Sequence, residues 1–144
     1  MDDLVEYITN KDGILALQNK MLREEQVEIP TLEFITSGLY TREIIIPKGT
    51  ALISRVWKDP YVDIMISGDI SVVTDKGLQR YTGYNLFVGV PERKRAGYAH
   101  EDTVWVTVHR TDYKSHEGLL ELMSVPNEQD LIQEKEICQV LLPQ

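Results

Sequence analysis

The sequence predicts an all-β fold, a single small antiparallel β-barrel of jelly-roll type with helical extensions at both ends. Three observations lead to this expectation. Short segments between residues 39 and 112 alternate apolar and polar residues with the period of two that strands have. Gly or Pro marks the turns between them, at intervals of roughly eight to twelve residues. The segments on either side instead carry apolar residues at helical spacing.

Residues 1–38 are the predicted N-terminal helical lead, with a helix over residues 2–25. Its apolar stripe recurs at spacings of three and four, as Ile14, Leu17 and Met21. A turn at Ser37-Gly38 then leads into the first strand. Such a helix either covers one opening of a barrel or packs against a partner subunit.

Residues 39–112 are the predicted barrel. The expected strands are residues 42–46, 51–57, 61–66, 70–74, 78–81, 86–90 and 103–109. Turns at Pro47-Lys48-Gly49, Ser67-Gly68-Asp69 and Asp75-Lys76-Gly77 separate several of them, because Pro presets φ and Gly supplies positive φ. Glu101 and Asp102 are interpreted as preparing a loop or capping the turn before the last strand.

Residues 113–144 are the predicted C-terminal helical tail. One short helix carries Leu119, Leu120, Leu122 and Met123, and a second contains Leu131 and Ile132. The apolar stretch 137–142 is able to form a strand along a barrel edge or on a neighbouring subunit. Helices and tail together offer more apolar surface than one small barrel covers, so we expect a homo-oligomer, most simply a two-fold dimer.

Composition bounds the function. A chain of 144 residues suits one domain, and a net charge of −8 argues against a nucleic-acid partner, which needs clustered Lys and Arg. No apolar run is long enough to cross a bilayer, and Met1-Asp2-Asp3 is acidic where a signal peptide is basic. We therefore expect a cytoplasmic protein without a membrane partner. The one cysteine, Cys138, fits a reducing compartment and is interpreted as an inert thiol.

The glycine spacing resembles the first motif of the cupin superfamily of small jelly-roll barrels. That motif runs glycine, five residues, His-x-His, three or four residues, glutamate, six residues, glycine, and its polar side chains hold a divalent metal. Here the glycines fall at Gly49 and Gly68, the histidine places at Arg55 and Trp57, and the glutamate place at Tyr61. The resemblance implies the barrel fold, but the ligand places have changed.

The second cupin motif contributes one more histidine ligand, and the sequence admits two registers for it. One register places His100 there, and the other places Ala96. At most one ligand place therefore carries a metal-binding group, whereas metal affinity needs several converging donors. We expect no bound metal and no cofactor.

Three segments, LYTREIIIPKG, ISGDISVVTDKG and RAGYAHEDTVWVTVHRTD, resemble short cupin-like proteins encoded by tailed bacteriophages. That group has an N-terminal helical lead and an acidic helical tail, and its role is mostly unassigned. For this chain the resemblance implies a phage protein that acts in the host cytoplasm.

Arg55, Trp57 and Tyr61 share the inward face if the motif register holds. A guanidinium beside two aromatic rings suits an anion with a flat ring, such as a nucleotide or an aryl acid. The alternative is that the two rings fill a closed barrel while Arg55 pairs with Asp63 or Asp59.

Arg93-Lys94-Arg95 is the one dense basic run of the sequence. Arg93 and Arg95 would grip a phosphate at the barrel mouth or contact an acidic patch on another subunit, or the run is a solvated loop. His100, beside two carboxylates, is a weak candidate for an acid or base working with a tyrosine, as in metal-free sugar epimerases with this barrel. His109 and His116 are interpreted as surface or cap groups.

Three functions remain open from the sequence. The first is a phage-type accessory protein, more a binding protein than an enzyme, that binds or sequesters a small anionic, nucleotide-like ligand through Arg55, Trp57, Tyr61 and the basic run. The second is a virion or assembly component that uses the barrel as an oligomerisation unit. The third is a metal-independent isomerase or epimerase that uses His100.

Overall fold

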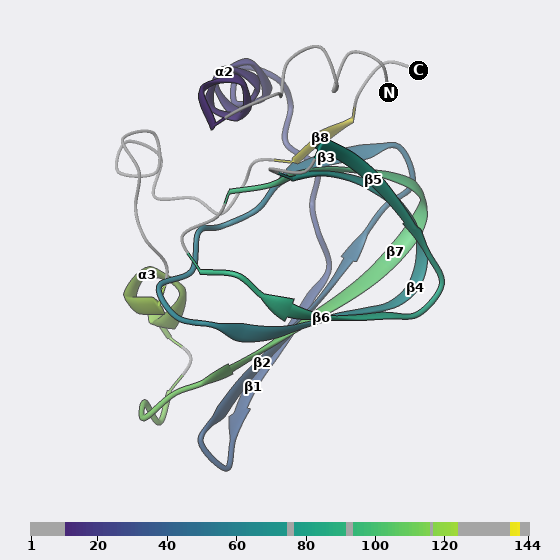
Figure 1. Cartoon of the computed structure of the whole chain (residues 1–144). Coiled ribbons are helices and arrows are strands. Elements are labelled where there is room, and N and C mark those ends of the chain that lie inside the picture. The colour runs from purple at the N-terminus through teal and green to yellow at the C-terminus, as the bar shows by residue number, and fades with distance from the viewer. Residues whose placement is uncertain (1–10, 75–76, 92–93, 116, 124–138, 142–144) are drawn as a thin grey trace.

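The structure is a computed structural model that describes residues 11–74, 77–91, 94–115, 117–123 and 139–141. This part of the chain forms two helices and eight strands (Figure 1). In chain order they are α2 (Lys11–Met21), β1 (Thr31–Thr36), β2 (Leu39–Ile46), β3 (Thr50–Ile53), β4 (Tyr61–Thr74), β5 (Gly77–Thr82), β6 (Asn85–Gly89), β7 (Ala96–Arg110), α3 (Leu119–Met123) and β8 (Gln139–Leu141).

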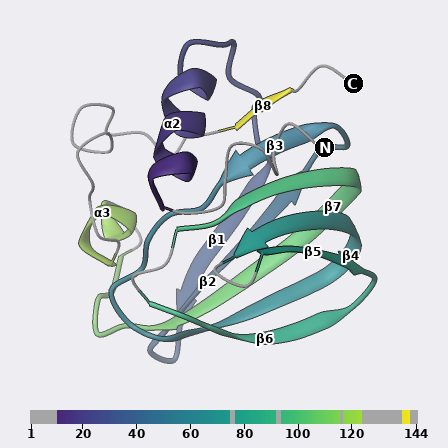
Figure 2. The ribbon, with the colours of Figure 1, turned by 45° about the horizontal axis from the view of Figure 1, so that its top comes forward.

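Strands β4 and β7 are the longest and organise the barrel. They pair with each other, antiparallel, over most of their length. β7 also pairs with β2 and β3, and β4 also pairs with β5 and β6, while β1 extends the sheet from β2 and β8 from β3. Figures 1 and 2 show these strands curving around a common interior. The predicted all-β jelly-roll barrel is confirmed.

The turn predicted at Ser67-Gly68-Asp69 is wrong, because β4 runs straight through these residues. The pairing of β4 with β7 shifts register three times between Met65 and Ile70, so the glycine marks a bulge rather than a reversal. Gly68 has φ of 118°, and a Cβ there would lie 2.6 Å from the Cα of Thr103. The bulge bends one long strand so that it serves both halves of the barrel.

Glu101 and Asp102 do not lie in the loop or turn that the sequence indicated, because β7 already begins at Ala96. The sheet also reaches further toward the N-terminus than residue 39, since β1 lies within the predicted lead and pairs with β2. In the tail, α3 matches the first expected helix, and β8 lies along the edge of β3 as one of the two interpretations expected. The second tail helix lies outside the described residues.

Helix α2 carries the apolar stripe that the spacing predicted, and it is buried. Ile14, Leu17 and Met21 form one core cluster with side chains of β3, the end of β4 and the start of β7. A second cluster fills the barrel interior: Ile46, Met65, Ile70, Val72, Ala99 and Trp105. Within the described residues, neither helix has the length and apolar character that a membrane span requires.

Candidate functional site

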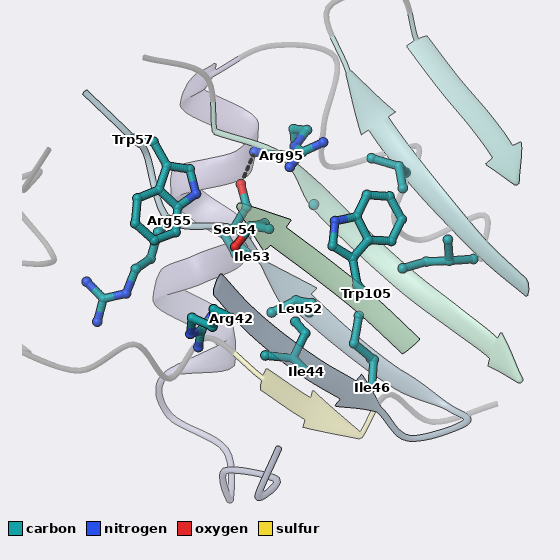
Figure 3. Close-up of a pocket in the computed structure, with 15 residues that line it drawn as sticks. Arg42, Ile44, Ile46, Leu52, Ile53, Ser54, Arg55, Trp57, Arg95 and Trp105 are labelled. Carbon is teal, nitrogen blue, oxygen red and sulfur yellow. Dashed lines mark hydrogen bonds between the residues drawn. The ribbon is translucent and has the colours of Figure 1, made fainter. Parts of the chain in front are cut away.

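A cavity lies inside the barrel and is lined by residues of four strands and of the segment after β3 (Figure 3). It offers about 90 Å³ to the centres of water molecules, several times the space that one water needs, which is roughly 10 to 15 Å³ by the same measure. Its wall is mostly apolar, with Ile44, Leu52, Ile70, Val72 and Trp105 among the lining residues. The cavity can therefore hold a small organic molecule.

Three arginines also line the cavity: Arg42, Arg55 and Arg95. Among the lining residues that the structure describes there is no aspartate or glutamate. Figure 3 shows Arg42 and Arg55 on the same side as Trp57, with Trp105 across from them. The site thus joins an apolar wall to a cationic side, an arrangement that suits a ligand with an apolar body and an anionic group.

Strand register explains why these groups meet. Along β2 alternate residues face inward, which places Arg42 between Tyr40 and Ile44 on the inner face. Arg42 pairs with Thr107 on β7, and Thr107 pairs with Asp63 on β4. A polar row therefore crosses three neighbouring strands inside the barrel.

Asp63 is fully buried and holds one of the arginines in place. Its carboxylate accepts a hydrogen bond from the indole N–H of Trp105 and pairs with the guanidinium of Arg95 at 2.9 Å. Arg95 also donates to the hydroxyl of Tyr61 at 3.2 Å, and its backbone N–H donates to Ser54 Oγ at 2.9 Å. Arg95 is thus a neutralised part of the barrel wall.

Arg42 and Arg55 form the more electropositive side of the cavity. Burial lowers the pKa of Arg42, the neighbouring Tyr40 raises it and the charge of Arg55 lowers it again. The guanidinium stays protonated in spite of this, because arginine titrates far above neutral pH. Glu33 is the cross-strand partner of Arg42 on β1, and its carboxylate accepts a 2.5 Å hydrogen bond from the hydroxyl of Tyr40 and raises the pKa of Arg42.

An aromatic row closes the barrel next to the arginines. His109 lies among three rings, with centroids 4.2 Å from Trp57, 4.8 Å from Tyr61 and 5.8 Å from Tyr40. Burial and the nearby charge of Arg42 lower the pKa of His109 to about 4. The interpretation of His109 as a surface or cap group is therefore wrong: its ring is 2% exposed, and it is neutral at pH 7.

The structure brings together some of the predicted site residues. Arg55, Trp57 and Arg95 line the cavity. Tyr61 is buried behind it, with its ring 6.0 Å from Trp57 and its hydroxyl bonded to Arg95. The two rings thus fill one end of the barrel, as the closed-barrel alternative expected, while a cavity persists beside them.

His100 is not among the lining residues. Its Nε2 lies 2.7 Å from Ser71 Oγ, and its ring packs edge-on against Tyr98, which belongs to the cluster under α2. Its neighbour Ala99 belongs instead to the interior cluster, so strand alternation turns His100 away from the cavity. Arg93 and His116 lie outside the described residues, and the side chain of Lys94 is buried.

Sequence reasoning missed Arg42, Trp105 and the role of His109. The sequence does hold a signal for Arg42, since it lies on the same face of its strand as Tyr40, Ile44 and Ile46. An arginine on the apolar face of a strand indicates either a buried ion pair or a ligand site. For Trp105 and His109 the pattern points the other way, because Val104, Val106 and Val108 form the more apolar face of β7 and would be expected to lie inward.

The cupin metal site does not fit these residues. The places of its ligands hold Arg55, Trp57 and Tyr61, and His100 lies away from the cavity. The one carboxylate in the polar row, Asp63, is engaged by Arg95 and Trp105. Among the described residues, no group of three or more His, Cys, Asp or Glu side chains is placed to hold a metal ion. Divalent cations require several such donors, and three arginines would repel them.

No protein-family model matches the sequence, and no curated protein matches it either. Solved structures do match. Ectoine synthase from P. lautus is 13% identical with a TM-score of 0.52, over 76% of this chain and 86% of that one. KdgF from Halomonas sp. is 12% identical with a TM-score of 0.50, over 63% and 91%. A cupin superfamily protein from Desulfitobacterium hafniense is 5% identical with a TM-score of 0.49, over 62% and 83%. At such identities likeness speaks for the fold alone, and the fold of this chain is a single cupin-like jelly-roll barrel.

Proposed function

We propose that this protein is a non-enzymatic binding protein that holds a small organic anion inside its barrel. The observation that carries the proposal is the cavity itself, with an apolar wall and the two arginines Arg42 and Arg55 on one side. Guanidinium groups form paired hydrogen bonds with carboxylates and phosphates, and they do so most strongly where water is excluded.

Between the two kinds of ligand that the sequence indicated, the site favours an aryl monoacid over a nucleotide. The cationic side formed by Arg42 and Arg55 suits one carboxylate, whereas a nucleoside monophosphate brings close to two negative charges. The apolar wall offers few hydrogen-bonding groups to the edge of a base, with Thr107 and Ser54 the polar uncharged side chains among the lining residues. Burying unsatisfied base edges is unfavourable, but burying a plain aromatic ring is not.

The biological setting follows from the resemblance to short phage-encoded cupin-like proteins. In this setting the protein acts in the host cytoplasm as an accessory factor and sequesters its ligand. Sequestration requires slow release of the ligand. Native mass spectrometry of protein purified from cells should then find a bound acid of low mass, while protein that arrives empty would argue against sequestration.

A thermal-shift panel tests binding directly. A series of benzoate-type carboxylates is compared with nucleoside monophosphates, because a ligand at 100 times its Kd stabilises the folded state by about 2.7 kcal/mol. We expect aryl carboxylates to raise the Tm of the native chain and Arg55→Gln to abolish the rise. The matched control is Arg80→Gln, which removes the same charge from a surface pair with Asp69. No shift with any acid, or equal shifts in both variants, would overturn the proposal.

An assembly role is a second candidate, favoured by the outer surface of the barrel described in the next subsection. It does not compete for the cavity. The third function weighed from the sequence, an isomerase that uses His100, receives no support, because that side chain is bonded to Ser71 away from the cavity.

A further inference from the structure

The outer face of one half of the barrel is almost entirely apolar. It is built by five strands side by side, in the order β6, β4, β7, β2 and β1. Their inward residues form the cavity rows described above, and their outward residues form two rows of their own. We call the outward surface the β6–β1 face.

Strand register defines the two rows. The first runs Val88, Val62, Val108, Thr41 and Phe34, and the second runs Leu86, Ile64, Val106, Glu43 and Leu32. Nine of these ten side chains are uncharged, and Glu43 is the exception. A strand that is apolar on both faces is typical of a sheet that is covered on both sides.

Five of these ten residues are exposed in the described chain, and the other five, toward the middle of the face, are half-buried. The relative exposure is 79% for Val88, 60% for Leu86, 59% for Leu32 and 44% for Phe34. Neither described helix covers them: α2 packs over β3 and the start of β7, and α3 lies beside the barrel (Figure 1). Single exposed apolar residues are ordinary, but a contiguous patch of several hundred Å² on a soluble protein marks an interaction site.

We propose that the β6–β1 face docks against the same face of a second copy of this chain, giving a two-fold dimer. The chain carries a net charge of −8, so two copies repel each other, and this repulsion opposes contact least at a face with one charged side chain among ten. Five large apolar side chains of the face are exposed, which is an apolar area on the order of several hundred Å² toward the roughly 800 Å² per partner of stable interfaces. A two-fold contact also needs one self-complementary surface, and two equivalent apolar rows supply it.

The proposal is independent of the ligand. On β2 and β7 the cavity residues and the residues of the β6–β1 face lie on opposite sides of the sheet, since side chains alternate along each strand. A variant that breaks the dimer should leave the response to aryl carboxylates intact. Failure of one proposal therefore leaves the other standing.

The test compares two leucines in matched positions. Leu86 on β6 belongs to the face, whereas Leu78 on β5 does not, and both strands pair with β4. Both side chains are exposed, Leu78 at 43%, so neither substitution opens the core. In a two-fold interface each substitution occurs twice, and each glutamate would be buried unpaired against the apolar face of the partner, which is strongly unfavourable.

Light scattering coupled to size-exclusion chromatography gives the mass directly. We expect twice the chain mass of 16.5 kDa for the native protein and for Leu78→Glu, and 16.5 kDa for Leu86→Glu at the same concentration. Circular dichroism should show all three folded. If Leu86→Glu does not fold, Val88→Lys at the most exposed position of the face takes its place.

Three outcomes overturn the proposal. The first is a native monomer, which would mean that the chain's own segments or a different protein cover the face. The second is a dimer that survives Leu86→Glu, which would place the contact elsewhere. The third is an equal loss of dimer in Leu78→Glu, which would show a general effect of added charge.

Discussion

His109 shows at the residue scale how the barrel interior controls chemistry. Three aromatic rings and the nearby Arg42 surround it, and its Nε2 is buried without a hydrogen-bond partner in the described chain. A charged imidazole there would lose its hydration and gain a repulsive neighbour. The residue is therefore held neutral, and it packs as an aromatic ring.

The pKa of His109 predicts an acid-labile fold. The pKa is about 4 in the folded chain against an ordinary value of 6.5, so the folded state binds a proton less readily than the unfolded state. The contribution of His109 to the free energy of unfolding is therefore complete above pH 6.5, and it is lost as the pH falls from there toward 4. The loss is about 3 kcal/mol of unfolding free energy. Urea unfolding of the native chain at a series of pH values between 7 and 4 measures it.

His109→Phe is the control for this effect, because it keeps a ring between the three neighbours and removes the titration. Burial also lowers the pKa of His100, so the variant should retain a smaller dependence of the same sign. The curve of the variant should be flatter than that of the native chain across this range. Parallel curves would show that His109 is not the responsible group.

Individual site residues were predictable only where a motif fixed them or, for Arg95, where a run of basic residues marked them. Arg55 and Trp57 were found because the glycine spacing identifies which positions correspond to the inward-facing ligand places of the cupin motif, and both residues line the cavity. Arg42 and His109 lie on strands without such a motif, and their position depends on which strands pair and in which register. Residue types along one strand do not determine that pairing.

At the element scale, β4 is the least predictable part of the fold. Its bulge at Gly68 carries the same local signal as a tight turn, a glycine between short polar residues. The difference arises in tertiary structure, where Thr103 of β7 packs against the glycine and holds the strand in register. Both strands on either side of the glycine were predicted, but their continuity was not.

Gly68→Ala should therefore be far more harmful than an ordinary glycine substitution. A Cβ at this position would lie 2.4 Å from Thr103 Oγ1 and 2.8 Å from a backbone oxygen, at a φ of 118°. Strain and overpacking together should lower the unfolding free energy by about 3 kcal/mol or more. Chemical denaturation with tryptophan fluorescence, which reports on Trp57 and Trp105, measures the change.

The matched control is Gly77→Ala. Gly77 also has a positive φ, of 95°, but a Cβ there meets nothing within 4 Å in the described chain. Gly77→Ala should lower the unfolding free energy only by the strain of an alanine in the left-handed region, about 1 to 2 kcal/mol. Equal losses in the two variants would mean that close packing at the bulge has no part in holding β4 and β7 together.

At the scale of the whole molecule, helix and barrel share the same strands. Ala96 of β7 belongs to the cluster under α2 and also lines the cavity, and so does Ile53 of β3. The helical lead was predicted from its stripe, and covering the barrel was one of its two expected roles. Because the two core clusters share the strands β4 and β7, the chain should unfold as one cooperative unit.

Leu17→Ala tests this coupling, since Leu17 is buried on α2 and belongs to the cluster that contains Ile53 and Ala96. Loss of a buried leucine should lower the unfolding free energy by about 2 to 5 kcal/mol. Tryptophan fluorescence reports on the barrel interior and circular dichroism at the helical wavelength reports on α2. In urea the two transitions should coincide and move together to lower concentration. A helical signal lost before the fluorescence changes would show that α2 is only loosely attached, and a cavity wall built on Ile53 and Ala96 would then not depend on it.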